Sequence, residues 1–209
     1  MHAPLSTTEP QPAWDIARLF PNQGFWQESD YFGVADTNRL VELVDGWIAV
    51  LEMPKIPHQR IVLYLRDLLK TFVAGRSGSK AGEVLVAPTY MRLRRGDIRE
   101  PDVLYLTAGR VGVDGVCEGA DLVMEVVSES AESHDRDWNQ KREDYARSGI
   151  PEYWIVDPQL KRVVVLKLAA SGVYELHAEA GEIGRVRSAL LPGFEVDSAA
   201  VWAAATNPS

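Results

Sequence analysis

The residue with the clearest chemical potential is Glu125, in the middle of the run LVMEVVS (122–128). A short and almost continuous apolar run is typical of a strand that is buried on both faces. A carboxylate buried there is costly unless it is paired, protonated or bound to a metal ion. Because its neighbours in the run offer no compensating charge, we interpret Glu125 as a functional acid. The alternative is a lone ion pair with an arginine of another element.

A second acid, Asp102, follows Pro101 and opens the apolar run VLYL. Pro-Asp is also a common turn dipeptide, so Asp102 alone is weak evidence for a site. The 23 positions that separate it from Glu125 allow one loop and a return to an adjacent strand. Two carboxylates on neighbouring strands can hold a hard cation such as Mg²⁺ or Mn²⁺, with water completing the coordination. The pair therefore predicts a metal site.

Such a site also needs a positively charged side chain. A lysine two residues after Glu125 would point to the same face of the strand, but that position is Val127. The run DRDWNQKREDYARSG offers Lys141 instead, four residues after Asp137 and so on the same face of a helix. The alternative interpretation of Lys141 is an ordinary exposed lysine.

The elements that must position these residues indicate one α/β domain with a mixed central sheet flanked by helices. Proline-rich residues 1–25 are expected to form an N-terminal arm, and residues 26–209 the domain. We expect strands at 39–53 (two, joined by the turn Asp45-Gly46), 84–93, 98–106, 122–128, 152–156, 161–168 and 173–178, and helices from Ile61 to about Gly75 and over 136–148.

Composition excludes several classes of protein. The chain has 209 residues, of which 46% are hydrophobic and 25% charged, as in ordinary soluble domains. No apolar run approaches the ~20 residues of a membrane-spanning helix, and the N-terminal segment lacks the pattern of a signal peptide. The single cysteine, Cys117, forms no intrachain disulfide and fits a reducing compartment. We therefore expect a cytoplasmic protein with no membrane partner.

Charge is distributed unevenly along the chain. The net charge of −8 argues against broad nonspecific binding to nucleic acid. The stretch 55–99, however, carries ten basic and only three acidic residues. It is either a surface that contacts phosphates, with Arg92, Arg94 and Arg95 in it, or the solvated sides of a helix and a hairpin.

Several runs together resemble a known family. PDVLYL, LVMEVVSES and DWNQKREDYARSGIPEYWIVDP, preceded by VELVDG and PHQRIVLYL, are similar to the Uma-two family of restriction endonucleases. That family belongs to the PD-(D/E)XK nuclease superfamily. The resemblance spans about residues 30–170 and implies a restriction-endonuclease-like fold.

The resemblance also implies roles for individual residues. Asp102 is similar to the superfamily's Pro-Asp aspartate and Glu125 to its second acid. Val127 departs from the superfamily's usual lysine position, and Lys141 is similar to the helical lysine that takes over that role in this family. His58, in PHQRIVLYL, falls on a recurring position of the family.

The acid pair and the resemblance predict a metal-dependent endonuclease that hydrolyses DNA phosphodiester bonds with Mg²⁺ or Mn²⁺. The resemblance further implies a homodimer. His58 could support the site or cap its helix, and Glu42, in VELVDG, could add an acid or lie exposed on a hairpin. Two other functions stay open. One is a catalytically inactive module of the same fold that binds nucleic acid or protein, and the other is a metal-dependent hydrolase of a smaller phosphoester.

Overall fold

The computed structural model of the chain describes residues 21–34, 40–75 and 82–206. Most of the predicted arm, residues 1–25, therefore lies outside the described residues. The described part forms one α/β domain around a mixed sheet, as the sequence predicts. No helix in these three segments is long and apolar enough to cross a membrane.

The main sheet has six strands in the order β11-β10-β9-β8-β6-β3. Only the central pair β8–β9 is parallel, and every other neighbouring pair is antiparallel. All residues of β8 and β9 are buried, which agrees with their almost continuous apolar sequences. The strands are β3 (Gly82–Val86), β6 (Val103–Thr107), β8 (Leu122–Val126), β9 (Glu152–Asp157), β10 (Arg162–Leu168) and β11 (Tyr174–Ala180).

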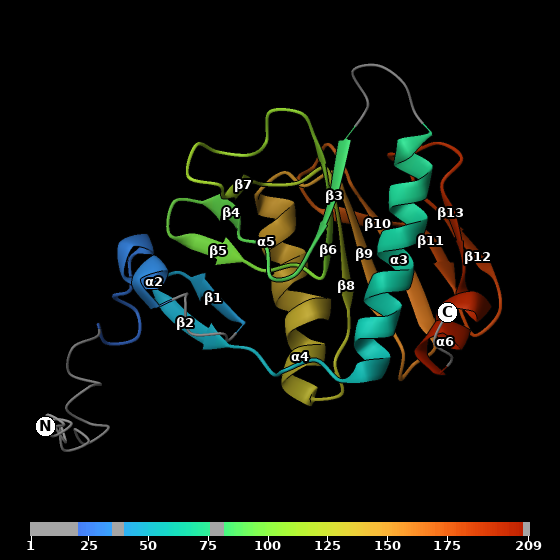
Figure 1. Cartoon of the computed structure of the whole chain (residues 1–209), viewed down its shortest axis with the longest axis horizontal. Coiled ribbons are helices and arrows are strands. Elements are labelled where there is room, and N and C mark those ends of the chain that lie inside the picture. The colour runs from blue at the N-terminus through green and yellow to red at the C-terminus, as the bar shows by residue number, and fades with distance from the viewer. Residues whose placement is uncertain (1–20, 35–39, 76–81, 207–209) are drawn as a thin grey trace, which may run out of the picture.

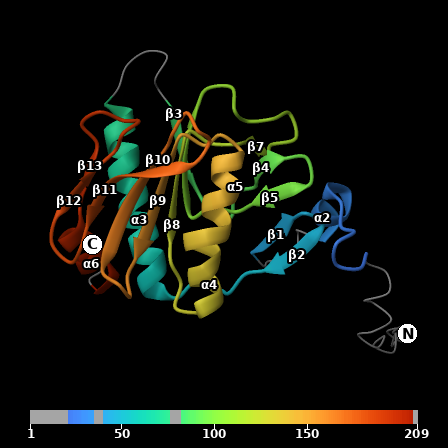
Figure 2. The ribbon, with the colours of Figure 1, turned by 180° about the vertical axis from the view of Figure 1, so that it is seen from behind.

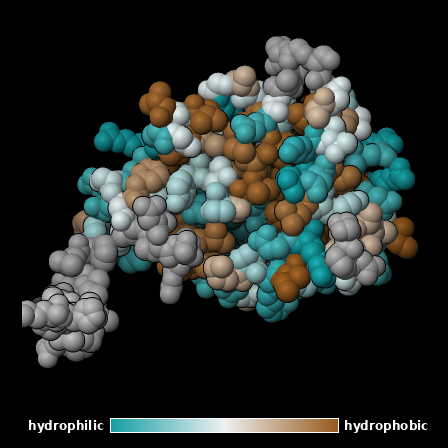
Figure 3. Space-filling model, in the orientation of Figure 1, coloured by the Kyte–Doolittle hydropathy of each residue, from teal (hydrophilic) through white to brown (hydrophobic). Residues whose placement is uncertain are grey.

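Helices cover both faces of this sheet (Figures 1 and 2). Helices α3 (Ile56–Ala74) and α6 (Ser198–Thr206) share one hydrophobic core with it. The other face packs against a helical run made of α4 (Ala131–Asp135), a π-helical turn (Arg136–Gln140) and α5 (Lys141–Arg147). In Figure 3, hydrophobic residues gather over the middle of the visible face, where β3 runs beside α3.

A second, five-stranded sheet in the order β2-β1-β5-β4-β7 lies beside the main one. The predicted turn between β1 and β2 is confirmed, because Asp45 and Gly46 both have positive φ, at 49° and 78°. Helix α2 (Glu28–Val34) packs on this sheet through Tyr31. The strands are β1 (Val41–Val44), β2 (Trp47–Val50), β4 (Met91–Arg94), β5 (Asp97–Arg99) and β7 (Cys117–Glu118).

Two of the predicted strands are wrong in extent. The segment 84–93 contains the last part of β3 and most of β4, with a break between them. The segment 98–106 likewise contains most of β5 and most of β6. Pro88 and Pro101 lie at the two breaks, because proline has no N–H to donate to a strand ladder. The chain thus crosses from the main sheet to the second sheet and back, and Asp102 lies at the return.

Helix starts also differ from the predictions. The first long helix begins at Ile56 and takes Pro57 into its first turn, where a missing N–H costs nothing. The second helical run begins at Ala131, because the Ser130 side chain accepts a hydrogen bond from the Ser133 N–H. Several further elements are not predicted by the sequence patterns: α2, α6, β7 and the small pair β12 (Arg185–Arg187) and β13 (Glu195–Asp197).

Candidate active site

A cleft of about 450 Å³ opens where the second sheet meets the main sheet. Asp102 enters it from the position directly before β6, Glu125 from β8 and Lys141 from the start of α5. His58, from the first turn of α3, also lines it. The structure therefore brings the acids and the lysine selected from the sequence into one cavity.

The two acids come from adjacent strands. Glu125 is 2% exposed, and its Oε2 lies 3.4 Å from the Asp102 backbone N, which donates to it. In return, the Val126 backbone N donates to Asp102 Oδ2 over 2.8 Å. This exchange places both carboxylates at the same end of the β6–β8 pair, as their separation in the sequence predicts.

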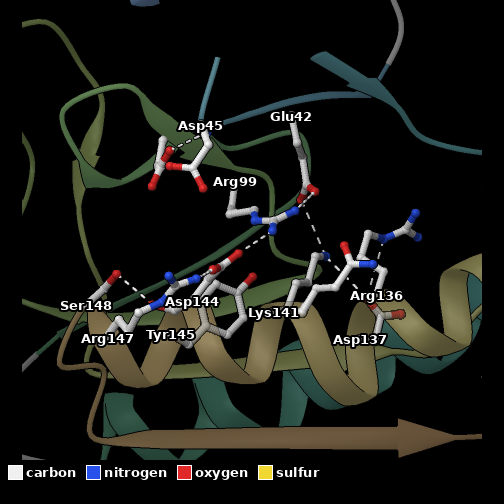
Figure 4. A network of polar contacts seen from close by, with 12 residues as sticks. Glu42, Asp45, Arg99, Arg136, Asp137, Lys141, Asp144, Tyr145, Arg147 and Ser148 are labelled. Carbon is white, nitrogen blue, oxygen red and sulfur yellow. Dashed lines mark hydrogen bonds and ion pairs between the residues drawn. The ribbon is translucent and has the colours of Figure 1, made fainter. Parts of the chain in front are cut away.

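Lys141 is buried among carboxylates and is not a surface lysine. Its Nζ lies 2.9 Å from Glu125 Oε1, 3.4 Å from Glu42 Oε1 and 3.5 Å from Asp137 Oδ1. The predicted pairing of Asp137 with Lys141 along one helical face is thus present (Figure 4). A lysine confined in this way has a fixed position beside the acid pair.

Glu42 is fully buried on β1, so the exposed-hairpin alternative is wrong. Arg99 Nη1 donates to Glu42 Oε2 over 2.6 Å, and the Glu100 backbone N donates to Glu42 Oε1 over 3.2 Å. Arg99 also pairs with Asp144 of α5 (Figure 4). Glu42 therefore links the second sheet to the helix that carries Lys141.

His58 contacts the acid pair. Its Nε2 lies 2.8 Å from the Val126 carbonyl oxygen and 3.4 Å from Asp102 Oδ2. These bonds lead away from the start of α3, so the capping alternative does not describe this side chain. The imidazole and the Val126 N–H therefore contact the same oxygen of Asp102, Oδ2.

Two residues of the site escaped the sequence analysis. The Tyr145 hydroxyl donates to Glu125 Oε1 over 2.6 Å, and its position four residues after Lys141 was the available signal. Arg136 lines the cleft, with Nη2 donating to Ser133 Oγ over 2.9 Å. Arg136 is five residues before Lys141, and the π-helical turn bonds the Lys141 N–H to the Arg136 carbonyl. Because a pattern with the α-helical period does not place residues five apart on one side, only the structure reveals Arg136.

Burial and neighbouring charges separate the pKa values of the acids. Burial raises the pKa of Glu125 to about 8, and Asp102 adds to the effect although Lys141 opposes it. Burial acts in the same direction on Asp102, but His58 and Lys141 outweigh it and hold its pKa below the usual range. Burial disfavours the charged form of Lys141, yet the surrounding acids raise its pKa above the ordinary value. Without a metal ion, the site therefore combines an ionised Asp102, a mostly protonated Glu125 and a charged Lys141.

The donors of the cleft fit a hard divalent cation. Asp102 and Glu125 present carboxylate oxygens, and Val126, which also lines the cleft, adds a carbonyl oxygen. Within the described segments no three or more His, Cys, Asp or Glu side chains form a group that could hold a metal ion. Two carboxylates with water and substrate oxygens are a usual coordination for Mg²⁺, whereas a zinc site would need more protein ligands.

Glu100, which also lines the cleft, gives a stability prediction. Its Oε1 accepts from the Tyr31 hydroxyl and the Val41 backbone N, both over 3.2 Å, while burial raises its pKa to about 7. The folded chain keeps a proton that the unfolded chain releases above its ordinary pKa of 4.5, so stability falls as pH rises from 4.5 to about 7. Glutamine cannot ionise, so Glu100→Gln should not show this loss of stability. We expect its free energy of unfolding, relative to that of the wild type, to rise by roughly 1–3 kcal/mol between acidic and mildly alkaline pH.

Calorimetric unfolding of the metal-free protein across this pH range would measure the gain. Glu42→Gln is the matched control: burial opposes its ionisation, but Lys141 and Arg99 lower its pKa to about 2, so its stabilising charge is present above its ordinary pKa of 4.5. That variant should lose stability at neutral pH. Parallel curves for wild type and Glu100→Gln would contradict the assignment.

In the described part of the basic stretch 55–99, Arg92 and Arg94 are engaged in ion pairs within the protein. Arg92 contacts Glu28 at 3.1 Å, Asp114 at 2.9 Å and also Glu118. Arg94 pairs with Asp45 and Asp97. All of these acids except Asp97 come from segments outside the stretch, so a count of its charges does not reveal them. The expectation that Arg92 and Arg94 contact DNA is therefore replaced by a structural role.

We expect Arg92→Ala to lower stability by roughly 1–2 kcal/mol, because it removes the shared partner of three carboxylates. The salt dependence of DNA binding should stay unchanged, since no released counterion is lost. Arg95→Ala is the matched control for stability, because Arg95 is exposed and has no ion pair within the described residues. Thermal unfolding and a salt titration of DNA binding measure the two effects. If Arg92→Ala makes DNA binding less dependent on salt, Arg92 contacts a phosphate and the structural role is wrong.

Comparisons with known proteins identify a family and a shared fold. The family model described as "Uma2: Putative restriction endonuclease" matches residues 27–201. A solved structure from Anabaena variabilis ATCC 29413, described as a putative nuclease, aligns with a TM-score of 0.67 over 86% of this chain and 99% of that chain. At 13% sequence identity, that likeness establishes a shared fold. No curated protein matches the chain.

Proposed function

The chain belongs to the Uma2 family of restriction endonucleases, and on that basis we propose that it is a metal-dependent endonuclease that hydrolyses DNA phosphodiester bonds. The observation that carries the proposal is the contact between Lys141 and Glu125, 2.9 Å long and buried beside Asp102 in an open cleft. Buried charges of both signs that also line a cavity are typical of catalytic sites.

Asp102 and Glu125 would hold the metal ion, Mg²⁺ or Mn²⁺. Bound there, the ion would lower the pKa of a water molecule and offset charge on the scissile phosphate. It would also favour the ionised form of Glu125, whose pKa is raised in part by the neighbouring charge of Asp102. His58 and the Val126 N–H keep the Asp102 carboxylate in place.

Lys141 acts as a donor and not as a base, because its surroundings favour the ammonium form. Its Nζ can stabilise the negative charge that develops on the phosphate oxygens as water attacks. Arg136, at the same side of the cleft, can contact the same phosphate or the next one. Tyr145 and Glu42 hold Glu125 and Lys141 from behind, so both act as positioning residues.

The test is cleavage of DNA by the purified full chain with Mg²⁺, with Mn²⁺ and with EDTA. We expect cleavage with either ion and none with EDTA, because the site has no other source of a strong nucleophile at neutral pH. Calorimetry with Mg²⁺ gives an independent measure of metal binding. Absence of metal binding would favour the inactive binding module, and metal binding without DNA cleavage would favour a hydrolase of smaller phosphoesters.

A homodimer and a cytoplasmic location are further parts of this proposal. One site cuts one strand, so cutting both strands of a duplex at one place would need two copies of the site. Light scattering at the concentrations used for cleavage would measure the oligomeric state. The single cysteine, Cys117, is buried and supports a reducing compartment.

A further inference from the structure

The cleft has two chemically different linings. Most of its polar groups lie on α3, on β8, on the helical run or directly before β6, with Glu52 the exception in segment 51–54, whereas two connecting segments, 51–54 and 87–90, supply most of the hydrophobic side chains. Tyr90 is held at the edges of two other rings, 5.8 Å from Tyr31 and 5.6 Å from Phe32 between centroids. The larger hydrophobic residues that these two segments contribute are Leu51, Met53, Pro54, Pro88 and Tyr90, and Leu40 lies beside them.

Few positive charges are available around the cleft for a DNA backbone. In the stretch 55–99, six of the eight described basic residues already bind protein groups, leaving Lys70 and Arg95. Inside the cleft, Arg136 and Lys141 face an excess of acids. Proteins that bind duplex DNA through its backbone use many phosphate contacts. This cleft offers contacts to one or two phosphates, so other interactions must hold the substrate.

The size of the cleft indicates what those interactions are. About 450 Å³ is the volume of a site for a small molecule. Bases inside a duplex are stacked and paired, and enzymes that enclose a single nucleotide act on a single strand or extrude that nucleotide. Hydrophobic and aromatic side chains can then bind the face of the unpaired base without reading its identity.

We infer that the cleft receives an unpaired nucleotide, whose base lies against segments 51–54 and 87–90 while its phosphate faces Lys141 and Arg136. The inference rests on the proposed endonuclease function and names its substrate class as single-stranded or locally unpaired nucleic acid. The scarcity of free positive charge and the hydrophobic lining next to the acid pair both favour this class over an intact duplex.

The experiment measures binding separately from cleavage. Fluorescence anisotropy compares a short labelled DNA strand with the same strand annealed to its complement, using the full chain with Ca²⁺ in place of Mg²⁺. We expect the single strand to bind at least roughly tenfold more tightly than the duplex. Tyr90→Ala should weaken single-strand binding by roughly five- to a hundredfold, the range for losing one stacked base, while Tyr90→Phe should bind as the wild type does.

Met53→Ser protects the test against misfolding of the tyrosine variant. Met53 is 70% exposed at the cleft, so its loss should weaken single-strand binding by roughly threefold or more without unfolding the chain. Ile183→Ser is the matched control, because Ile183 is 84% exposed and lies outside the cleft. It should bind both DNAs as the wild type does.

Equal binding of strand and duplex, or equal effects of Met53→Ser and Ile183→Ser, would overturn the inference. That result would leave the proposed endonuclease intact if Mg²⁺-dependent cleavage persists. Tight single-strand binding without cleavage under any metal would instead contradict the proposed reaction and support the assigned substrate class.

Discussion

Replacing Lys141 by methionine should slow single-turnover DNA cleavage by a factor of roughly one hundred or more at saturating Mg²⁺. This is the scale of losing one preorganised electrostatic donor at a reacting centre. Methionine keeps much of the buried stem and removes only the ammonium group. Affinity for Mg²⁺ should change little, because lysine is not a ligand, and calorimetry would check this.

The fold should tolerate this change. Removing the ammonium leaves Glu42 paired with Arg99 at 2.6 Å, and Glu125, with a pKa raised to about 8, can stay protonated. Lys167→Met is the matched control, because Lys167 is exposed on β10 and has no ion pair within the described residues. Full cleavage activity in Lys141→Met would remove this residue from the mechanism.

A lysine introduced on another element can replace the positive charge that Lys141→Met removes. Val127 lies two residues after Glu125, so a lysine there would start on the same face of the chain. Val127 also lines a neighbouring cavity that includes His58, which gives a longer side chain room to extend. We expect Val127→Lys to restore part of the activity of Lys141→Met, and rescue would show that the ammonium is what the site lacks.

Glu125→Gln and Asp102→Asn should each abolish Mg²⁺-dependent cleavage while leaving the metal-free protein folded. Glutamine resembles the protonated carboxyl that Glu125 holds near neutral pH, so the thermal midpoint of that variant should stay level or rise. Metal affinity should fall in both variants, because each loses one of two carboxylate ligands. Cleavage assays, calorimetry and thermal unfolding give three independent measurements.

Glu132→Gln is the matched control for the acid variants, because Glu132 is exposed on α4 and outside the cleft. It should retain cleavage, metal affinity and stability. If Asp102→Asn and Glu125→Gln instead unfolded the protein, the two acids would be structural. The endonuclease proposal would then lose its metal site.

Local features of the sequence determined much of the domain. The apolar run around Glu125 specifies a strand buried on both faces, and Asp45-Gly46 specifies a tight turn, because both signals lie within a few neighbouring residues. The helical spacing of Asp137 and Lys141 is equally local, and it placed the lysine on the correct face. The mixed sheet and the meeting of the acids in one cleft followed from such signals.

Interactions between distant segments were decided only by the tertiary structure. Glu42 is buried because the crossing between two sheets brings it to Arg99, 57 residues away, and to Lys141 on a third element. The same crossing places Arg92 and Arg94 in ion pairs with acids of the protein, although the positive charge of their stretch suggested a surface that binds DNA. Two residues that form an ion pair through tertiary packing have no fixed spacing along the chain, so composition and periodicity cannot identify the pair. The position of Arg136 shows the same limit within one helix, because a π-helical turn changes which residues share a side.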